Sequence, residues 1–132
     1  MLVDTNVLSE LARPRPNPAV VRWLTEQSRI HVSVITLEEL AFGVARARGG
    51  ARARLGAWLD ELIAARPTLL DVTPAVARAS GELRAARESR GRRVGMADML
   101  IAATALTHGL TLVTHNVRDF EACGVKVFDP FA

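Results

Sequence analysis

The chain has 132 residues, a formal net charge of +3 and 49% hydrophobic residues, with only 5% aromatic. This length suits one domain, 1–132, and no apolar stretch is long enough to span a bilayer, which excludes a membrane protein. A lone Cys123 excludes an internal disulfide, so we expect a protein of the reducing cytoplasm. The basic balance favours a polyanionic partner, and the apolar, aromatic-poor composition favours a subunit interface.

The hydrophobic pattern predicts short strands that alternate with helices along almost the whole chain. A first strand ends at Val3, and further strands are expected at 30–34, 69–72, 110–114 and 125–128. Helices are expected at 7–11, 19–27, 36–46, 51–65, 74–90 and 97–108. Residues 91–95 are expected to form a loop, and 116–119 a local turn. This alternation indicates an α/β fold with a mainly parallel central sheet flanked by helices on both faces.

Four acidic residues stand beside apolar sequence, unlike the acids of a solvated helix face: Asp4, Glu39, Asp98 and Asp119. Because ligands bind beyond the carboxyl ends of parallel strands, Asp4, 36–39 and 114–116 are expected to meet at one edge of the sheet. Gathered carboxylates repel one another unless a cation joins them, and their hard oxygens favour Mg²⁺ or Mn²⁺. There is no Cys/His spacing typical of zinc and no Gly-rich phosphate loop.

Each of these acids also has a purely structural interpretation. Asp4 is a candidate N-cap for the helix that follows it, and residues 36–39 fit a capping box in which Glu39 reaches back to the helix start. Asp98 is expected in a first helical turn, where the helix dipole favours any acid, and Asp119 falls in the predicted turn. The residues alone therefore leave both a shared metal site and a set of caps open.

Four segments resemble, in the same order, the motifs of PIN-domain ribonucleases and among them the VapC toxins, including the FitB-like branch. They are Val3–Glu10, Val34–Leu40, Ala97–Ala105 and Leu112–Phe120, and the ending Val127–Pro130 is also similar. In the second motif the functional acid stands just before Leu, which selects Glu39 over Glu38. The fourth motif departs from members that carry Asp where this chain has Asn116, because here the acid follows at Asp119.

The resemblance implies an endoribonuclease, dependent on Mg²⁺ or Mn²⁺, that cleaves RNA by attack of water on a phosphodiester. It implies that Asp4 and Asp98 hold the ion, that Glu39 completes its surroundings or orients the water, and that Asp119 helps to place the water. The residues implied to support these carboxylates by hydrogen bonds are Thr5, Asn6, Thr114 and Asn116.

The family resemblance also implies partners: RNA, a VapB-like antitoxin that lies in a groove between helices, and a second copy of the chain in a homodimer. Arg90, Arg92 and Arg93 precede Asp98 on a Gly-flanked loop, where they are candidate RNA-phosphate contacts or simply solvated. We interpret His115 as a turn residue facing water. Two alternatives stay open: a catalytically weakened PIN-like nucleic-acid or protein binding module, and a phosphatase or DNA nuclease on the same fold.

Overall fold

Five strands form one fully parallel sheet at the centre of the computed structural model, which describes residues 1–132. The strands are β1 (Leu2–Val3), β2 (His31–Ser33), β3 (Thr68–Leu70), β4 (Leu112–Val113) and β5 (Val127–Phe128). Their order across the sheet is β3-β2-β1-β4-β5. In this register Leu2 aligns with His31 on one side and with Leu112 on the other. The predicted parallel sheet is confirmed.

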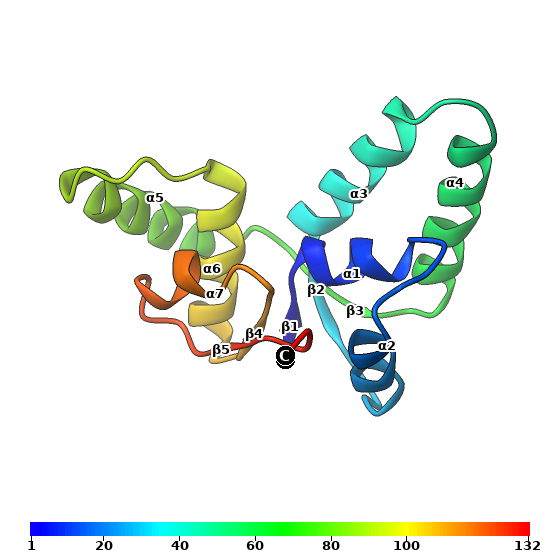
Figure 1. Ribbon diagram of the computed structural model, residues 1–132. Helices are drawn as coiled ribbons and strands as arrows, with labels where there is room; N and C mark the ends of the chain where they lie inside the picture. The colour runs from blue at the N-terminus through cyan, green and yellow to red at the C-terminus, as the bar shows by residue number, and fades with distance from the viewer.

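Helices cover both faces of the sheet, as the alternation of strands and helices predicts. They are α1 (Thr5–Leu11), α2 (Pro18–Thr25), α3 (Val34–Arg46), α4 (Gly49–Ala64), α5 (Pro74–Ser89), α6 (Met96–His108) and α7 (Val117–Glu121). Figure 1 shows α1 to α4 on one side of the strands and α5 to α7 on the other. No helix combines the length and apolar character that crossing a membrane requires.

The core consists of two clusters, one on each face of the sheet. Neighbouring residues of a strand point to opposite faces, so Leu2 and Leu112 join one cluster while Val3 and Val113 join the other. All four side chains are fully buried. Because both faces are covered, these strands are apolar at successive positions, as is typical of parallel sheets.

Helix α6 packs closely against the sheet. Its residues Met99 and 101–105 are buried, and several of them are Ala, whose small side chain permits close approach to the strands. The helix ends at Gly109, which takes the left-handed conformation (φ 64°) expected of a glycine at this position. Asp98 is the only acid in its first turn, where its carboxylate faces away from this core.

Two local predictions are corrected by the structure. The second-motif helix begins at Val34, because the Ser33 side chain accepts a hydrogen bond from the Ile35 N–H (3.0 Å) and caps it. The predicted capping box at 36–39 is therefore wrong, since these residues already lie inside the helix. The expected turn at 116–119 is instead the entry to the short helix α7, which buries Phe120 in the core.

The strand order places a switch in connectivity between β1 and β4. From β1 the chain proceeds to β2 and β3 on one side, whereas β4 and β5 are added on the other. The loops that leave β1 and β4 therefore diverge, and such a divergence leaves a crevice at the carboxyl edge of the sheet. Asp4 follows β1 and Thr114 follows β4 directly, so both residues lie at this crevice.

Candidate active site

Asp4 is the most buried acid of the chain, and three hydrogen bonds hold its carboxylate. Its Oδ1 accepts from the Thr5 backbone N–H (2.8 Å), which caps α1 as the structural interpretation expected. Its Oδ2 accepts from the Thr114 hydroxyl (2.8 Å) and from Asn6 Nδ2 (3.2 Å). The side chain is only 3% exposed. Capping uses a single oxygen, so Asp4 is placed by more contacts than a cap requires.

The surroundings of Asp4 make its negative charge costly. Burial raises the pKa of this carboxyl from 3.8 to about 6. The hydrogen bonds from Thr114 and Thr5 lower the pKa, while the nearby carboxylates of Asp98 and Glu39 raise it further. Acids whose ionised form is disfavoured by burial and by like charges are common in sites that bind cations or perform catalysis.

Glu39 is linked to Asp4 through Thr5. The Thr5 hydroxyl lies 2.6 Å from Glu39 Oε1 and 3.0 Å from Thr36 Oγ1. A hydroxyl has one proton, so Thr5 donates to Glu39 and accepts from Thr36. Glu39 therefore reaches across to α1 instead of back to the start of its own helix. This bridge holds the acids of β1–α1 and α3 in one arrangement, with the Thr5 backbone N–H on Asp4 and its hydroxyl on Glu39.

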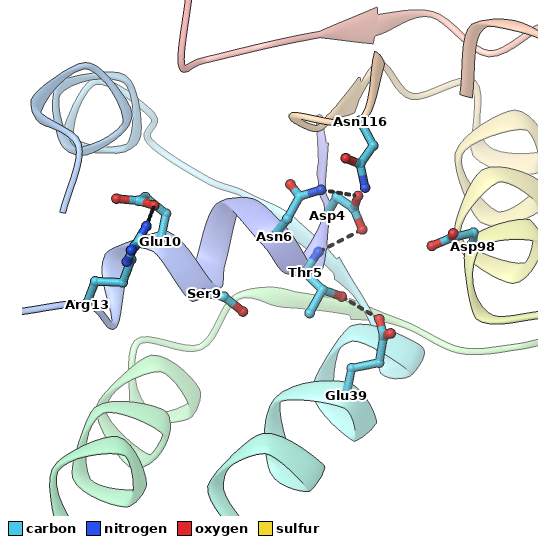
Figure 2. A pocket seen from close by; sticks show the side chains of 9 residues that line it. All are labelled: Asp4, Thr5, Asn6, Ser9, Glu10, Arg13, Glu39, Asp98 and Asn116. Atoms are coloured by element: carbon cyan, nitrogen blue, oxygen red, sulfur yellow. Dashed lines mark hydrogen bonds and ion pairs between the residues drawn. The ribbon is translucent and has the colours of Figure 1, made fainter. Parts of the chain in front are cut away.

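Asp98 approaches the same site from the opposite side of the crevice (Figure 2). Its side chain is half-buried at the start of α6, and burial raises the pKa of its carboxyl, with further contributions from Glu39 and Asp119. In Figure 2 no hydrogen bond joins this carboxylate to the other residues drawn. Its charge is therefore not balanced by a basic group of this pocket.

A polar pocket of about 530 Å³ lies between these carboxylates. None of its lining residues is hydrophobic; they are Asp4, Thr5, Asn6, Ser9, Glu10, Arg13, Glu39, Asp98 and Asn116. Four of them are acids and one is basic. The single cation, Arg13, is already paired with Glu10 (3.1 Å). The pocket therefore carries a concentrated negative charge that attracts cations.

The donor chemistry of this pocket fits a hard divalent cation. Carboxylate, hydroxyl and amide oxygens line it, without thiolate or imidazole groups. No three Asp, Glu, His or Cys side chains of the structure converge closely enough to enclose an ion by themselves. Mg²⁺ binds through one or two carboxylates and retains several water ligands, so a wide group of carboxylates satisfies its requirements.

The fourth motif divides between this acidic pocket and its neighbour. Asn116 lines the acidic pocket, and its backbone N–H donates to the Thr114 hydroxyl (3.0 Å). Asp119 lies on α7 outside that pocket and forms an ion pair with Arg92 (2.6 Å). The proximity of Asp119 still raises the pKa of Asp98, so it lies close to the site without lining it.

The three predicted RNA-contacting arginines differ in their positions. Arg92 points to Asp119, whereas Arg90 and Arg93 are exposed and line neither the acidic pocket nor the neighbouring pocket that contains Asp119.

Sequence reasoning also missed three lining residues, Ser9, Glu10 and Arg13. A helical repeat would have found the first two, because Ser9 and Glu10 lie three and four residues after Asn6 and share its face of α1, while Arg13 follows just beyond the end of that helix. The pKa of Glu10 is lowered, chiefly by a hydrogen bond from the Asn17 N–H.

Comparison with known proteins identifies the family of this chain. Residues 1–125 match the family model of the PIN domain. The chain is 34% identical to the VapC ribonuclease Y4jK of Sinorhizobium fredii, over 99% of this chain and 97% of that protein. It is 37% identical to the toxin FitB of Neisseria gonorrhoeae, over 99% and 98% of the two chains.

A solved structure shares the same architecture. The crystal structure of FitAcB from Neisseria gonorrhoeae superimposes with a TM-score of 0.85 at 36% identity, covering 98% of this chain and 97% of that one. The family model and both relatives extend over all four motifs and the residues of the acidic pocket. The chain therefore belongs to the PIN-domain family, in the group that contains VapC ribonucleases and the toxin FitB.

Proposed function

We propose that this protein is a metal-dependent endoribonuclease that acts as the toxin of a toxin–antitoxin pair. The observation that carries the proposal is the convergence of Asp4, Glu39 and Asp98 from three different elements on one polar pocket. The names of the relatives, a VapC ribonuclease and a toxin, support the same reaction and the same biological role.

In this proposal Asp4 and Asp98 hold Mg²⁺ or Mn²⁺ from opposite sides of the pocket, and Glu39 completes the set of acids. When bound, the ion lowers the pKa of the attacking water and neutralises charge that develops on the phosphate. The chain's own contribution is to fix the carboxylates: Thr114 and Asn6 orient Asp4, while Thr5 orients both Asp4 and Glu39.

The two polar residues of the fourth motif have different roles in the proposal. Asn116 lines the pocket and has an amide that can hydrogen-bond a water or a phosphate oxygen. Asp119 acts from outside the pocket, where it helps to place the attacking water only if its ion pair with Arg92 opens. Glu10 is a better candidate than Asp119 for a fourth lining carboxylate, because it already faces the pocket.

The decisive test is RNA cleavage with Asp4→Asn, Asp98→Asn and the matched control Asp60→Asn, which removes an exposed acid of α4. Total cellular RNA and purified transfer RNA are incubated with Mg²⁺, Mn²⁺ or EDTA. We expect cleavage by wild type and by the control in metal only, and none by the first two variants. Cleavage by Asp4→Asn at the wild-type rate would refute the assignment.

The same experiment separates the nuclease from a binding module without catalysis. The distance between the acids and the presence of Asn116 are the observations in favour of a binding module. If wild type binds RNA in a gel-shift assay but cleaves none of these substrates with either metal, the binding module replaces the nuclease. Cleavage of single-stranded DNA in preference to RNA would indicate a DNA nuclease, and hydrolysis of phosphomonoesters would indicate a phosphatase.

We propose that a VapB-like antitoxin inhibits the enzyme by lying in the groove between α1, α3 and α4. A ribonuclease toxin acts on the RNA of its own cell, which requires an inhibitor. The groove has a volume of about 230 Å³ and an apolar wall that includes Leu40, Leu55 and Trp58. It shares Ser9 and Glu39 with the acidic pocket, so a segment bound there reaches the active site.

Gly43 lines this groove, and a Cβ added to it meets no atom within 4 Å. Gly43→Leu therefore places a side chain in the groove without a clash at its Cβ. We expect this variant to cleave RNA normally and to escape inhibition by the antitoxin encoded beside the gene. Inhibition equal to that of wild type would place the antitoxin elsewhere.

We also propose a homodimer that works in the cytoplasm, where the RNA is. The exposed apolar side chains of Ile63 and Leu69 support an apolar contact between copies. Light scattering coupled to size-exclusion chromatography tests the dimer, and a monomer at micromolar concentration would contradict it.

A further inference from the structure

A second polar pocket adjoins the acidic one and is chemically different from it. It has a volume of about 400 Å³, and its lining includes Arg92, His115, Arg118, Asp119 and Asp129. Asn116 lines both pockets, so the two adjoin at that residue. Any chain molecule that lies across the acidic pocket toward α7 therefore enters this second pocket next.

His115 is held in this pocket by three contacts. Its Nδ1 lies 3.1 Å from Asp129 Oδ2, and its ring packs against the Phe131 ring with 4.2 Å between centroids. Its backbone N–H donates to Asn6 Oδ1 (3.2 Å), which connects it to the acidic pocket. The side chain nevertheless remains 56% exposed. With Nδ1 and one ring face engaged, Nε2 is the ring nitrogen left for a ligand, and in the imidazolium form it donates.

The two arginines of the pocket offer further donors. Arg92 uses Nη2 to bind Asp119 and keeps its other N–H groups, with about half of its side chain exposed. Arg118 is exposed and forms no ion pair within 4.0 Å. Both carboxylates of the pocket are thus already engaged, Asp119 by Arg92 and Asp129 by His115. The N–H groups that remain available to a ligand belong to Arg92, Arg118 and His115.

We propose that Arg118, Arg92 and His115 bind a backbone phosphate of the RNA next to the phosphate that is cleaved. The inference rests on the proposed ribonuclease function and names the site that holds the substrate beside the acidic pocket. An RNA chain carries one negative charge per nucleotide, and four carboxylates in the acidic pocket repel it. Cationic donors immediately beside that pocket offset this repulsion and orient the chain across the acids.

Arg118 gives the sharpest test, because it has no ion-pair partner whose loss would disturb the fold. Its matched control is Arg29→Ala, which removes one exposed arginine just before β2. Arg29 therefore lies at the amino ends of the strands, away from the pockets at their carboxyl ends. Binding of a short fluorescein-labelled single-stranded RNA of mixed sequence is measured by fluorescence anisotropy in EDTA, so that metal-dependent cleavage does not interfere. Steady-state kcat and KM are then measured in Mg²⁺ on an RNA that wild type cleaves.

We expect Arg118→Ala to weaken RNA binding about three- to tenfold relative to Arg29→Ala and to raise KM with little change in kcat. The slope of log Kd against log salt is expected to fall by about 0.7, the value for one lost phosphate contact to a single strand. Arg118→Lys is expected to restore most of the affinity, since the charge returns.

Equal binding, equal KM and an equal salt slope for Arg118→Ala and Arg29→Ala would overturn the proposal and leave the pocket to another ligand, such as an acidic protein segment. This failure is distinct from failure of the proposed function. If wild type cleaves no RNA yet Arg118→Ala still weakens binding, the phosphate site stands and the nuclease assignment falls. If wild type cleaves RNA and Arg118→Ala matches the control, the reverse holds.

Discussion

The buried carboxylate of Asp4 makes the metal-free protein less stable as pH rises. Its pKa is about 6 in the folded protein and 3.8 as the ordinary value. Between these values the folded state binds more protons than the unfolded state, so the free energy of unfolding falls as pH rises and the loss is complete above the folded pKa. The rise in this pKa from 3.8 to about 6 corresponds to about 3 kcal/mol, which water screens little because the side chain is only 3% exposed.

This loss is large enough for a simple denaturation assay. About 2 kcal/mol of it falls between pH 4.5 and pH 7.5, because the folded and unfolded states already differ in charge at pH 4.5. With a urea m-value of about 1.5 kcal/mol per M, the unfolding midpoint of wild type in EDTA is expected to fall by about 1.3 M over this range. Asp4→Asn cannot ionise and keeps an oxygen for the Thr5 N–H, so its midpoint is expected to fall much less than that of wild type, with Asp98, whose pKa is also raised, causing the remaining fall. Asp60→Asn, which removes an exposed acid, is expected to follow wild type.

Binding of a metal ion is expected to restore the stability that ionisation of Asp4 removes. At pH 7.5, Mg²⁺ at about 100 times its dissociation constant is expected to stabilise wild type by about 2.7 kcal/mol, comparable to the loss caused by the buried charge. Asp4→Asn is expected to gain much less. If wild type and Asp4→Asn lose the same stability from pH 4.5 to pH 7.5 in EDTA, the buried charge of Asp4 is not the cause, and its raised pKa is refuted.

Four further variants test other features of the structure. Thr5→Val removes the hydroxyl that bridges Glu39, and we expect about a 10- to 100-fold loss of cleavage or metal affinity; unchanged activity would contradict this bridge. Gly43→Ala is expected to raise the free energy of unfolding by about 0.5–1 kcal/mol, whereas Gly109→Ala, at φ 64°, is expected to lower it by about 1 kcal/mol; urea titrations decide both signs. Arg87→Met is expected to raise the free energy of unfolding by about 1 kcal/mol, because the buried Nε and Nη2 of Arg87 have no hydrogen-bond partner. A lower stability of this variant in calorimetry would mean that these nitrogens do have a partner in the folded protein.

The fold is largely predictable because local patterns carry it. Apolar runs at successive positions mark strands buried on both faces, as at Leu112–Val113, and Gly109 marks the end of α6. Helix starts are less predictable. Ser33 and Thr36 are both suitable caps, and the choice between them depends on where β2 ends in the sheet. The sequence predicts only a turn where α7 forms, because this helix is short and is held by the burial of one side chain, Phe120.

The sequence by itself determined that Asp4, the segment 36–39 and the segment 114–116 meet at one edge of a parallel sheet, and it singled out Asp98 as a further acid beside apolar residues. Apolar neighbours and chain order are sufficient for that inference, because connectivity rules leave few arrangements of such elements. The family motifs carried the same positions. Their hydrogen-bonded supports, Thr5 and Thr114, followed from the same segments.

Only the tertiary structure decided which side chains face one another. It paired Asp119 with Arg92 across 27 residues of sequence, brought Glu10 into the acidic pocket, and placed His115 in the second polar pocket beside it. Thr114 reaches Asp4 across 110 residues. Such contacts depend on the rotation and spacing of whole elements, to which every packed residue contributes, and no local pattern of charge or hydrophobicity records them.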